Sequence, residues 1–347
     1  MIRHSLRQLG ITEQVVIHEQ GYDQFIEEKG LKQLGQGGEA TVYFLRGHAV
    51  KVARPDSAPA LLREIAHMLH LNRFVGAGGA MGERTREDWP ALLWVYSLSD
   101  GSLSIGMKPF DNPDSLVPGA TLYEHLEAGP PLEREHTLRI VWGICRSLVY
   151  AHQSGIIHHD LKPANIYIPS DPQQQPIVFD LAQALWQQGS WGRNWLTHEH
   201  NCTYWYNGTY RYMHYQRRLA HLAAVAKATS ELPNAQQAEA FKRYKPSFYD
   251  DVSAFARILH DMVRSMNTWL STKDRVTLRK FYRRLLGLKH SSAADTERSG
   301  ETSIFRRIRL VLGGSHPPAP VVVDHDPPQI AMADVLPPLE KVLSGLS

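Results

Sequence analysis

The chain has 347 residues, of which 43% are hydrophobic and 21% are charged, and its formal net charge is +3. This size and composition predict a soluble globular protein with a substantial core, in one large domain or two modest ones. The small net charge gives no indication of a nucleic-acid or membrane-surface partner. The two cysteines, Cys145 and Cys202, exclude a disulfide framework, and Cys145 is expected to be a buried free thiol.

Targeting signals are also missing from the sequence. No run approaches the roughly 18 apolar residues that a transmembrane helix requires. The first residues, MIRHSLRQLGITEQ, lack the apolar core of a signal peptide. We therefore expect a cytoplasmic protein, although delivery into another cell is compatible with this sequence.

The first hundred residues read mainly as strands. Residues 1–24 are expected to form a polar extension with one strand at 15–17, and from Phe25 the pattern predicts strands on either side of a glycine-rich turn, GQGGEA at 35–40. Such glycines let backbone N–H groups approach phosphate, although an isolated glycine-rich hairpin is more often only a turn. The β-branched and aromatic residues at 41–45 argue against the helix that a Rossmann motif would need there.

Two charged residues then occur inside apolar patterns. Lys51 lies in a predicted strand over 48–53, and Glu64 lies in a predicted helix over 58–71. Either side chain alone could simply reach solvent. Strands are predicted at 91–98 and 103–108, joined by an Asp-Gly turn, and the pattern is helical from residue 121, with a long amphipathic helix over 132–153. A strand-rich first third followed by helices predicts a two-lobed α+β architecture.

The most informative stretch runs from residue 155 to 182. It contains Asp160, Lys162 and Asn165 between short apolar runs, and a second apolar run at 177–179 ends in Asp180. Two short strands that deliver polar residues to one edge predict a hairpin with Asp160, Asn165 and Asp180 close together. Such oxygen ligands suit Mg²⁺, which also keeps waters and substrate phosphates, and Lys162 would add a positive charge.

These residues resemble protein kinases. HHDLKPAN at 158–165 is similar to the catalytic loop H-R-D-L-x-x-x-N, and DLA at 180–182 stands where the family has D-F-G. Residues 35–40 resemble the glycine-rich loop, and Lys51 and Glu64 match the paired lysine and glutamate of the family in order and spacing. The resemblance is to a divergent member of the eukaryotic-like Ser/Thr protein kinases and covers about residues 25–312.

The resemblance implies a kinase N-lobe at 25–110 and a C-lobe at 111–312, which would hold a long aromatic-rich activation segment and a helical insertion at 219–244. Residues 313–347 would form a proline-rich tail, extended or disordered, with a short helix at the end. A basic amphipathic helix is predicted at 275–289; its charged face is more often solvated than bound to a partner. Asp251, in a stretch similar to the start of the αF helix, would hold the catalytic loop by its backbone, and it could also cap that helix.

The implied cofactors are ATP and Mg²⁺, and the implied reaction is phosphoryl transfer to a hydroxyl of a protein substrate. Asp160 would accept or orient the hydroxyl proton, Lys162 would neutralise the transferring group, and Asn165 and Asp180 would hold the metal. Lys51, oriented by Glu64, would hold the phosphates. The other residues implied to bind ATP are Gly35, Gln36, Gly37, Gly38, Ala40, Val42, Ala49, Met107 and Phe110, with the hinge at 107–110 placed by chain order alone.

Residues 183–216 depart from the family pattern. They are rich in Trp and Tyr, which could stack nucleic-acid bases, but we favour packing against the lower lobe because the net charge is small. GTYRYM at 208–213 resembles the substrate-binding end of the activation segment, whereas HYQ replaces the A-P-E that follows, so the usual anchoring glutamate is missing. His198, His200 and Cys202 are zinc-type ligands, but solvated loop residues are the better interpretation because a fourth ligand is lacking.

Two substitutions relative to the family pattern concern the regulation of activity. His159 replaces the arginine that receives a phosphate in many kinases, so phosphorylation within 183–216 is predicted not to be the main activating step. Ala182 replaces the glycine of D-F-G and should restrict the backbone near Asp180, favouring constitutive activity. Three functions compete: a Ser/Thr protein kinase, a small-molecule kinase of the aminoglycoside or choline type, which generally lacks Lys162, and a pseudokinase scaffold.

Overall fold

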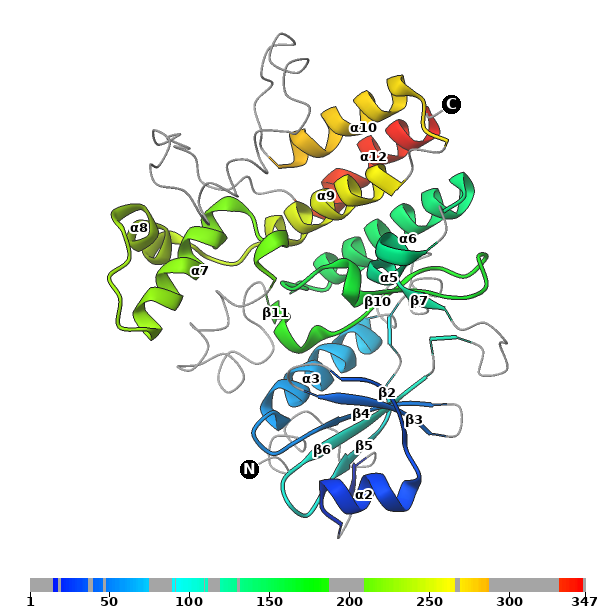
Figure 1. The fold of residues 1–347 in the computed structure, drawn as a ribbon, viewed down its shortest axis with the longest axis vertical. Coiled ribbons are helices and arrows are strands. Elements are labelled where there is room, and N and C mark those ends of the chain that lie inside the picture. The colour runs from blue at the N-terminus through cyan, green and yellow to red at the C-terminus, as the bar shows by residue number, and fades with distance from the viewer. Residues whose placement is uncertain are drawn as a thin grey trace.

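The protein is described by a computed structural model that covers residues 15–17, 20–36, 40–45, 48–74, 89–90, 92–108, 110–111, 119–129, 132–186, 209–265, 269–286 and 331–345. A strand-rich lobe lies at one end and a helical lobe at the other (Figure 1). The two-lobed α+β architecture expected from the sequence is therefore confirmed. None of the helices in the described ranges is both long and apolar enough to cross a membrane.

The N-terminal lobe is built on a six-stranded sheet in the order β1-β5-β6-β4-β3-β2. Its neighbours are antiparallel except for β1, which pairs with β5 in parallel. The predicted strands at 15–17, 48–53, 91–98 and 103–108 are confirmed, and β2 pairs with β3 as expected, although residues 37–39 of the glycine-rich turn lie outside the described residues. Gly101, with φ of 88°, makes the turn between the last two strands. The strands are β1 (Val15–Ile17), β2 (Lys32–Gln36), β3 (Thr41–Leu45), β4 (His48–Ala53), β5 (Leu92–Ser97) and β6 (Leu103–Met107).

One helix covers each face of this sheet (Figure 1). Helix α3 (Ala58–Phe74) packs on the face that carries Ile105 and Met107, and α2 (Tyr22–Lys29) packs on the face that carries Val50 and Val52. The strand expected from Phe25 onward is wrong for residues 25–29, which are helical. Tyr22, Phe25 and Ile26 recur at helical spacing and bury one face, and Gly30, with φ of 59°, ends the helix.

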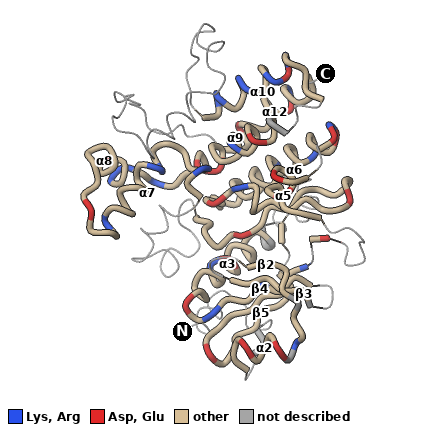
Figure 2. The backbone as a smooth tube through the Cα atoms, viewed as in Figure 1, with Lys and Arg blue, Asp and Glu red and all other residues tan. Residues whose placement is uncertain are grey.

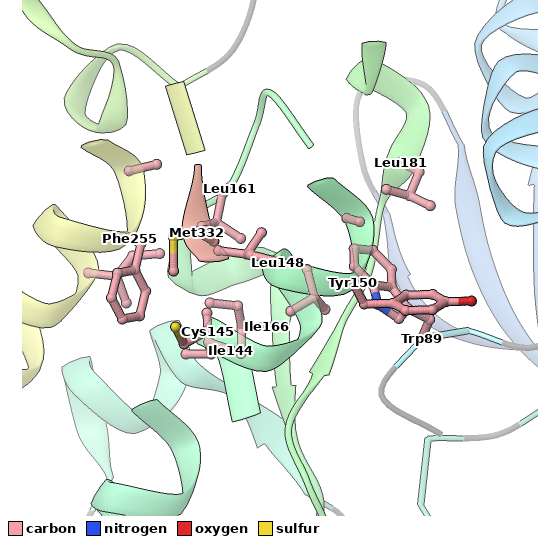
Figure 3. Packing of buried hydrophobic residues seen from close by; sticks show 14 of the residues in the cluster. Trp89, Ile144, Cys145, Leu148, Tyr150, Leu161, Ile166, Leu181, Phe255 and Met332 are labelled. Atoms are coloured by element: carbon pink, nitrogen blue, oxygen red, sulfur yellow. The ribbon is translucent and has the colours of Figure 1, made fainter. Parts of the chain in front are cut away.

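The C-terminal lobe is assembled around the long helix α6 (Arg134–Gln153), which confirms the predicted helix over 132–153. Figure 3 shows Ile144, Cys145 and Leu148 of α6 packed with Phe255 and Met332. Cys145 is a buried free thiol, as predicted, and burial raises its pKa. The other helices are α5 (Leu122–Ala128), α7 (Tyr215–Ala228), α8 (Ala235–Arg243), α9 (Phe248–Ser265), α10 (Thr272–Leu285) and α12 (Met332–Ser344).

Two peripheral elements have distinct positions. Helices α7 and α8, where an insertion was expected, lie to one side of the lobe and share a small apolar cluster that contains Tyr244 (Figure 1). Helix α10 corresponds to the predicted basic helix, and Lys and Arg mark several of its positions (Figure 2).

The helix expected near the C-terminus is confirmed as α12, but it is part of the body of the lobe. Met332, Val335, Leu339 and Leu343 repeat every three or four residues and are buried in the main core cluster. The rest of the predicted proline-rich tail, residues 313–330, lies outside the described residues.

Candidate active site

Short strands on either side of the catalytic-loop motif deliver its polar residues to one place. β8 (Ile156–Ile157) precedes the motif, and a 3₁₀ turn, η3 (Pro163–Asn165), leads into β9 (Ile166–Ile168), which pairs with β10 (Ile177–Val178). The expected hairpin is therefore present. Phe179, directly after β10, donates its N–H to the carbonyl oxygen of Asn165 at 3.0 Å. Asn165, just before β9, and Asp180, just after β10, therefore lie at neighbouring strand ends.

Asp251 holds the catalytic loop through hydrogen bonds to its backbone, as predicted. It is fully buried at the start of α9 and accepts the backbone N–H groups of His158 at 2.7 Å and His159 at 2.9 Å. Nε2 of His152 lies 2.9 Å from the same carboxylate. One buried carboxylate thus pairs three donors that would otherwise be unsatisfied.

The carboxylate of Asp160 is oriented by three donors. Lys162 Nζ lies 2.6 Å from one carboxylate oxygen, and Thr209 donates its backbone N–H at 2.8 Å and its hydroxyl at 3.0 Å to the other. The side-chain amide of Asn165 donates to the carbonyl oxygen of Asp160 at 2.9 Å. Thr209 belongs to the GTYRYM stretch, so the end of the activation segment lies directly against this carboxylate.

Lys51 connects the two lobes. Its Nζ lies 2.6 Å from Glu64 Oε2, on α3, and 3.0 Å from Asp180 Oδ1. Burial disfavours the charged form of Lys51, but attraction to Glu64 and Asp180 outweighs burial and raises its pKa. Burial likewise opposes ionisation of Asp180, whereas Lys51 lowers the pKa of this carboxyl below its ordinary value. Both groups are charged at neutral pH.

The sheet places the other expected ATP-binding residues on the same face as Lys51. Val42 lies directly opposite Lys51 on the neighbouring strand, and Met107 lies directly opposite Ala49. Ala49 and Lys51 are two residues apart on one strand and therefore point to the same face. All four side chains consequently share this face. The ring of Phe110 lies 5.4 Å from that of Phe179, beside Asp180. Gly35 and Gln36 are exposed at the end of β2, and Ala40 packs against the core. Gly37 and Gly38 lie outside the described residues.

The donor set near Asp180 fits Mg²⁺. The amide of Asn165 and the carboxylate of Asp180 offer hard oxygen ligands, and Mg²⁺ commonly takes one or two protein ligands and completes its shell with waters and phosphates. No cluster of three or more His, Cys, Asp or Glu side chains suited to a metal occurs in the described part of the chain. The zinc-type residues His198, His200 and Cys202 lie outside it.

Helix α3 is tied to the start of the activation segment. The ring of Trp186, in β11 (Leu185–Trp186), lies 5.0 Å from that of His67 and 4.4 Å from that of His70. Arg63 donates to the carbonyl oxygen of Ala182 at 3.4 Å. Because these contacts come from the helix that carries Glu64, they fix the distance between Glu64 and the segment that follows Asp180.

His67 should make stability depend on pH. Burial, with repulsion from Arg63 and His70, lowers the pKa of His67 to about 3. The unfolded chain binds this proton near pH 6.5, so the contribution of His67 to stability is present above pH 6.5 and is lost progressively as the pH falls toward 3. We expect His67→Phe, which keeps a ring against Trp186, to flatten this dependence by about 2 kcal/mol between pH 6.5 and 5.

Urea unfolding of the wild type and of His67→Phe at pH 6.5 and pH 5 measures this difference. His159, whose pKa is also lowered, is present in both proteins and does not affect the comparison. Equal losses of stability in the two proteins would show that His67 is protonated in the folded state as easily as in the unfolded chain.

The end of the activation segment is anchored without the missing glutamate. Arg218 of α7 donates to the carbonyl oxygens of Met213 at 2.9 Å and Arg211 at 2.7 Å. Asp261 of α9 pairs with Arg211 at 2.9 Å and accepts from the hydroxyl of Tyr212 at 3.3 Å. Arg218 and Asp261 could not be predicted from sequence motifs. Arg218 lies in the α7–α8 region and Asp261 lies within the regular helix α9, and neither stretch contains a motif that marks these residues.

The region around the catalytic loop is similar to known protein kinases. Residues 115–213 match the family described as "Protein kinase domain". A probable serine/threonine-protein kinase of Streptomyces coelicolor is 31% identical over 162 residues, which are 45% of this chain and 22% of that protein. The serine/threonine-protein kinases PknB of Mycobacterium leprae and Mycobacterium tuberculosis are 32% and 30% identical, over 44% and 45% of this chain and 24% of each relative.

Over this region the chain is similar to serine/threonine protein kinases. The matched region is less than a quarter of the length of these relatives.

Proposed function

We propose that this protein is an ATP- and Mg²⁺-dependent serine/threonine protein kinase that transfers the γ-phosphoryl group of ATP to a hydroxyl of a protein substrate. The observation that carries the proposal is the meeting of Lys51, Glu64 and Asp180 within 2.6–3.0 Å, next to the loop of Asp160. Similarity to the relatives above, which are named serine/threonine-protein kinases, supports the same conclusion.

Each residue has a role that its surroundings support. Lys51, kept charged by Glu64 and Asp180, would bind the phosphates, and the backbone of residues 35–40 would cover them. Val42, Ala49, Met107 and Phe110 would surround the adenine. Asn165 and Asp180 would hold Mg²⁺, which when bound offsets the negative charge of the phosphates.

Asp160 and Lys162 would act on the acceptor. Asp160, oriented by Lys162 and Thr209, would orient the substrate hydroxyl and accept its proton. The ammonium group of Lys162 lies beside that carboxylate, where it would neutralise charge on the transferring group. Little covalent chemistry is required, so the rate would depend on positioning and electrostatic stabilisation.

The contact between Lys162 and Asp160 favours a protein kinase over a small-molecule kinase, since the aminoglycoside and choline types generally lack this lysine. A scaffold without activity would have no need for two groups of polar residues in contact, Lys51 with Glu64 and Asp180, and Asp160 with Lys162 and Asn165. Ala40, Ala182 and Gln216 nevertheless depart from the family pattern. We therefore propose a protein substrate.

Incubation with γ-labelled ATP and Mg²⁺, with casein as acceptor, tests the proposal. We expect wild-type protein to label itself or casein, and Lys51→Ala and Asp160→Ala to lower the rate by a factor on the order of 10³, because each removes a charge that acts on the transferring group. Lys273→Ala and Asp171→Ala remove exposed charges elsewhere and should leave the rate unchanged. ATP binding without transfer would indicate a scaffold, and label found only on small molecules would indicate the second class.

We also propose that phosphorylation of residues 183–216 is not the main activating step. Thr197 and Thr203 lie outside the described residues, and their replacement by alanine is the suitable test. Thr209→Ala is a poor test of phosphorylation, because the Thr209 hydroxyl donates to Asp160 and its loss would disturb that carboxylate directly.

A further inference from the structure

We propose that Arg217 of α7 and Tyr244, at the end of α8, are positioning residues for Asp160 and act on it through His159. The inference rests on the proposed kinase function and adds to it the α7–α8 region as a part of the catalytic machinery. Neither residue belongs to the motifs that identify the family in this sequence.

The backbone of His159 is held in a strained conformation. His159 directly precedes Asp160 and has φ of 67°, in the left-handed region that side chains other than glycine disfavour. Its N–H donates to Asp251 at 2.9 Å, and its carbonyl oxygen accepts from Arg217 Nη1 at 2.7 Å. The two peptide groups of His159 are therefore held by residues outside the loop, one by α9 and one by α7. These contacts also fix the direction of the backbone that leads into Asp160.

The side chain of His159 has one consistent arrangement of protons. Arginine has donors and no acceptor, so Arg217 Nη2, 3.1 Å from His159 Nδ1, must donate to it. The proton of the neutral ring is then on Nε2, which lies 3.1 Å from the Tyr244 hydroxyl and donates to its oxygen. The Tyr244 hydroxyl in turn donates to Asp250 Oδ1 at 2.9 Å. Burial and the nearby Arg217 lower the pKa of His159, which keeps the ring neutral.

The charges of this buried cluster are balanced. Asp250 is 2% exposed, and its carboxylate lies 3.9 Å from Arg217 Nη1 and 3.2 Å from His214 Nε2. It also accepts the backbone N–H of Ser247 at 2.8 Å. A buried polar network whose members have partners is rigid and sensitive to the loss of any one of them.

The contacts join two regions that are otherwise packed separately. Helices α7 and α8 have their own apolar cluster, whereas the catalytic loop belongs to the main core of the lobe. Arg217 and Tyr244 connect the α7–α8 region to His159. Because Arg217 is permanently charged, the loop can be held in this way without a phosphate on the activation segment.

Arg217→Lys and Tyr244→Phe test the proposal, with casein and γ-labelled ATP. Lysine keeps the charge but replaces the two separate guanidinium nitrogens by a single one, so it cannot reproduce the geometry of both contacts with His159, and we expect kcat to fall about 10–100-fold. Tyr244→Phe leaves the His159 Nε2–H group without its acceptor, and kcat should fall about 3–10-fold. KM for ATP should be unchanged in both variants, because Lys51, Glu64 and Asp180 are not contacted.

Tyr249→Phe is the matched control. Tyr249 is also a buried tyrosine, and its ring lies 5.5 Å from that of His214, as the Tyr244 ring lies 5.7 Å from it. Among the described residues, its hydroxyl makes no hydrogen bond to His159, Arg217 or Asp250, so kcat should be retained. All proteins should be assayed well below the unfolding temperature of the least stable variant, so that loss of folded protein does not enter kcat.

A double-mutant cycle shows whether Arg217 acts through His159. His159→Gln removes the contact of Arg217 with Nδ1 but keeps its contact with the backbone carbonyl oxygen, so in this background Arg217→Lys should lower kcat less than it does in the wild type. Equal effects in both backgrounds would overturn the inference. So would a kcat equal to that of the wild type in both Tyr244→Phe and Arg217→Lys. In either case, phosphoryl transfer by the wild-type protein would still support the proposed function. If the wild type transfers no phosphate to itself or to casein, the proposed function fails and this inference fails with it.

Discussion

Asp251→Ala is expected to lower the free energy of unfolding by about 3–5 kcal/mol and to abolish phosphoryl transfer. The fully buried carboxylate accepts from the backbone of His158 and His159 and pairs with His152, so its removal leaves three buried groups without this partner. The released loop carries Asp160. Urea unfolding followed by circular dichroism, together with the labelled-ATP assay, measures both effects.

Two further variants sharpen this result. Asp251→Asn keeps one acceptor oxygen but turns the other into a donor that faces donors, so its loss of stability should be smaller than that of the alanine variant. Asp171→Ala removes an exposed carboxylate that accepts one backbone N–H, from Gln173 at 2.8 Å, and should change stability by less than about 1 kcal/mol. Equal stability of Asp251→Ala and Asp171→Ala would contradict the role assigned to the buried carboxylate.

Leu339→Ala should lower the free energy of unfolding by about 2–5 kcal/mol, the usual cost of a cavity at a fully buried leucine. Leu339 is 0% exposed on α12, which packs against α6 and α10 in the main core. The cost arises because the surrounding side chains relax only partly into the space. Thermal unfolding should show a clear fall in the midpoint.

Glu340→Ala is the control for this variant. Glu340 follows Leu339 on the same helix but faces solvent, so its replacement should alter stability by about 0.5 kcal/mol or less. If Leu339→Ala and Glu340→Ala unfolded at the same temperature, α12 would have to be regarded as a loosely attached tail.

The residues of the two predictions, Asp251 and Leu339 of α12, are linked through His152. The backbone N–H of Met332, at the start of α12, donates to His152 Nδ1 at 3.1 Å, and His152 Nε2 therefore carries the proton that it donates to Asp251. The C-terminal helix thus supports the residue that supports the catalytic loop. Loss of α12 packing should for this reason reduce activity as well as stability.

Local patterns predicted the elements well where one periodicity dominated. The strands at 48–53 and 103–108 and the helix at 132–153 were predicted because their apolar residues repeat at strand or helix spacing over several turns or pairs. The pattern was misread at 25–29, where only a short segment follows Phe25 and the helical repeat begins earlier, at Tyr22. A segment of eight residues is too short for either period to dominate.

By itself, the sequence predicted the residues to which the proposed chemistry is assigned. Lys51, Glu64, Asp160, Lys162, Asn165 and Asp180 could be named because they match kinase motifs in residue type, order and spacing, and a motif is a local property of the chain. The tertiary structure decided what holds them. Arg217 and Tyr244 contact His159 across 58 and 85 residues of chain, and Met332 of α12 contacts His152, which pairs with Asp251, across 180 residues. Such contacts arise from the packing of whole helices, which leaves no periodic or motif signal in the residues themselves.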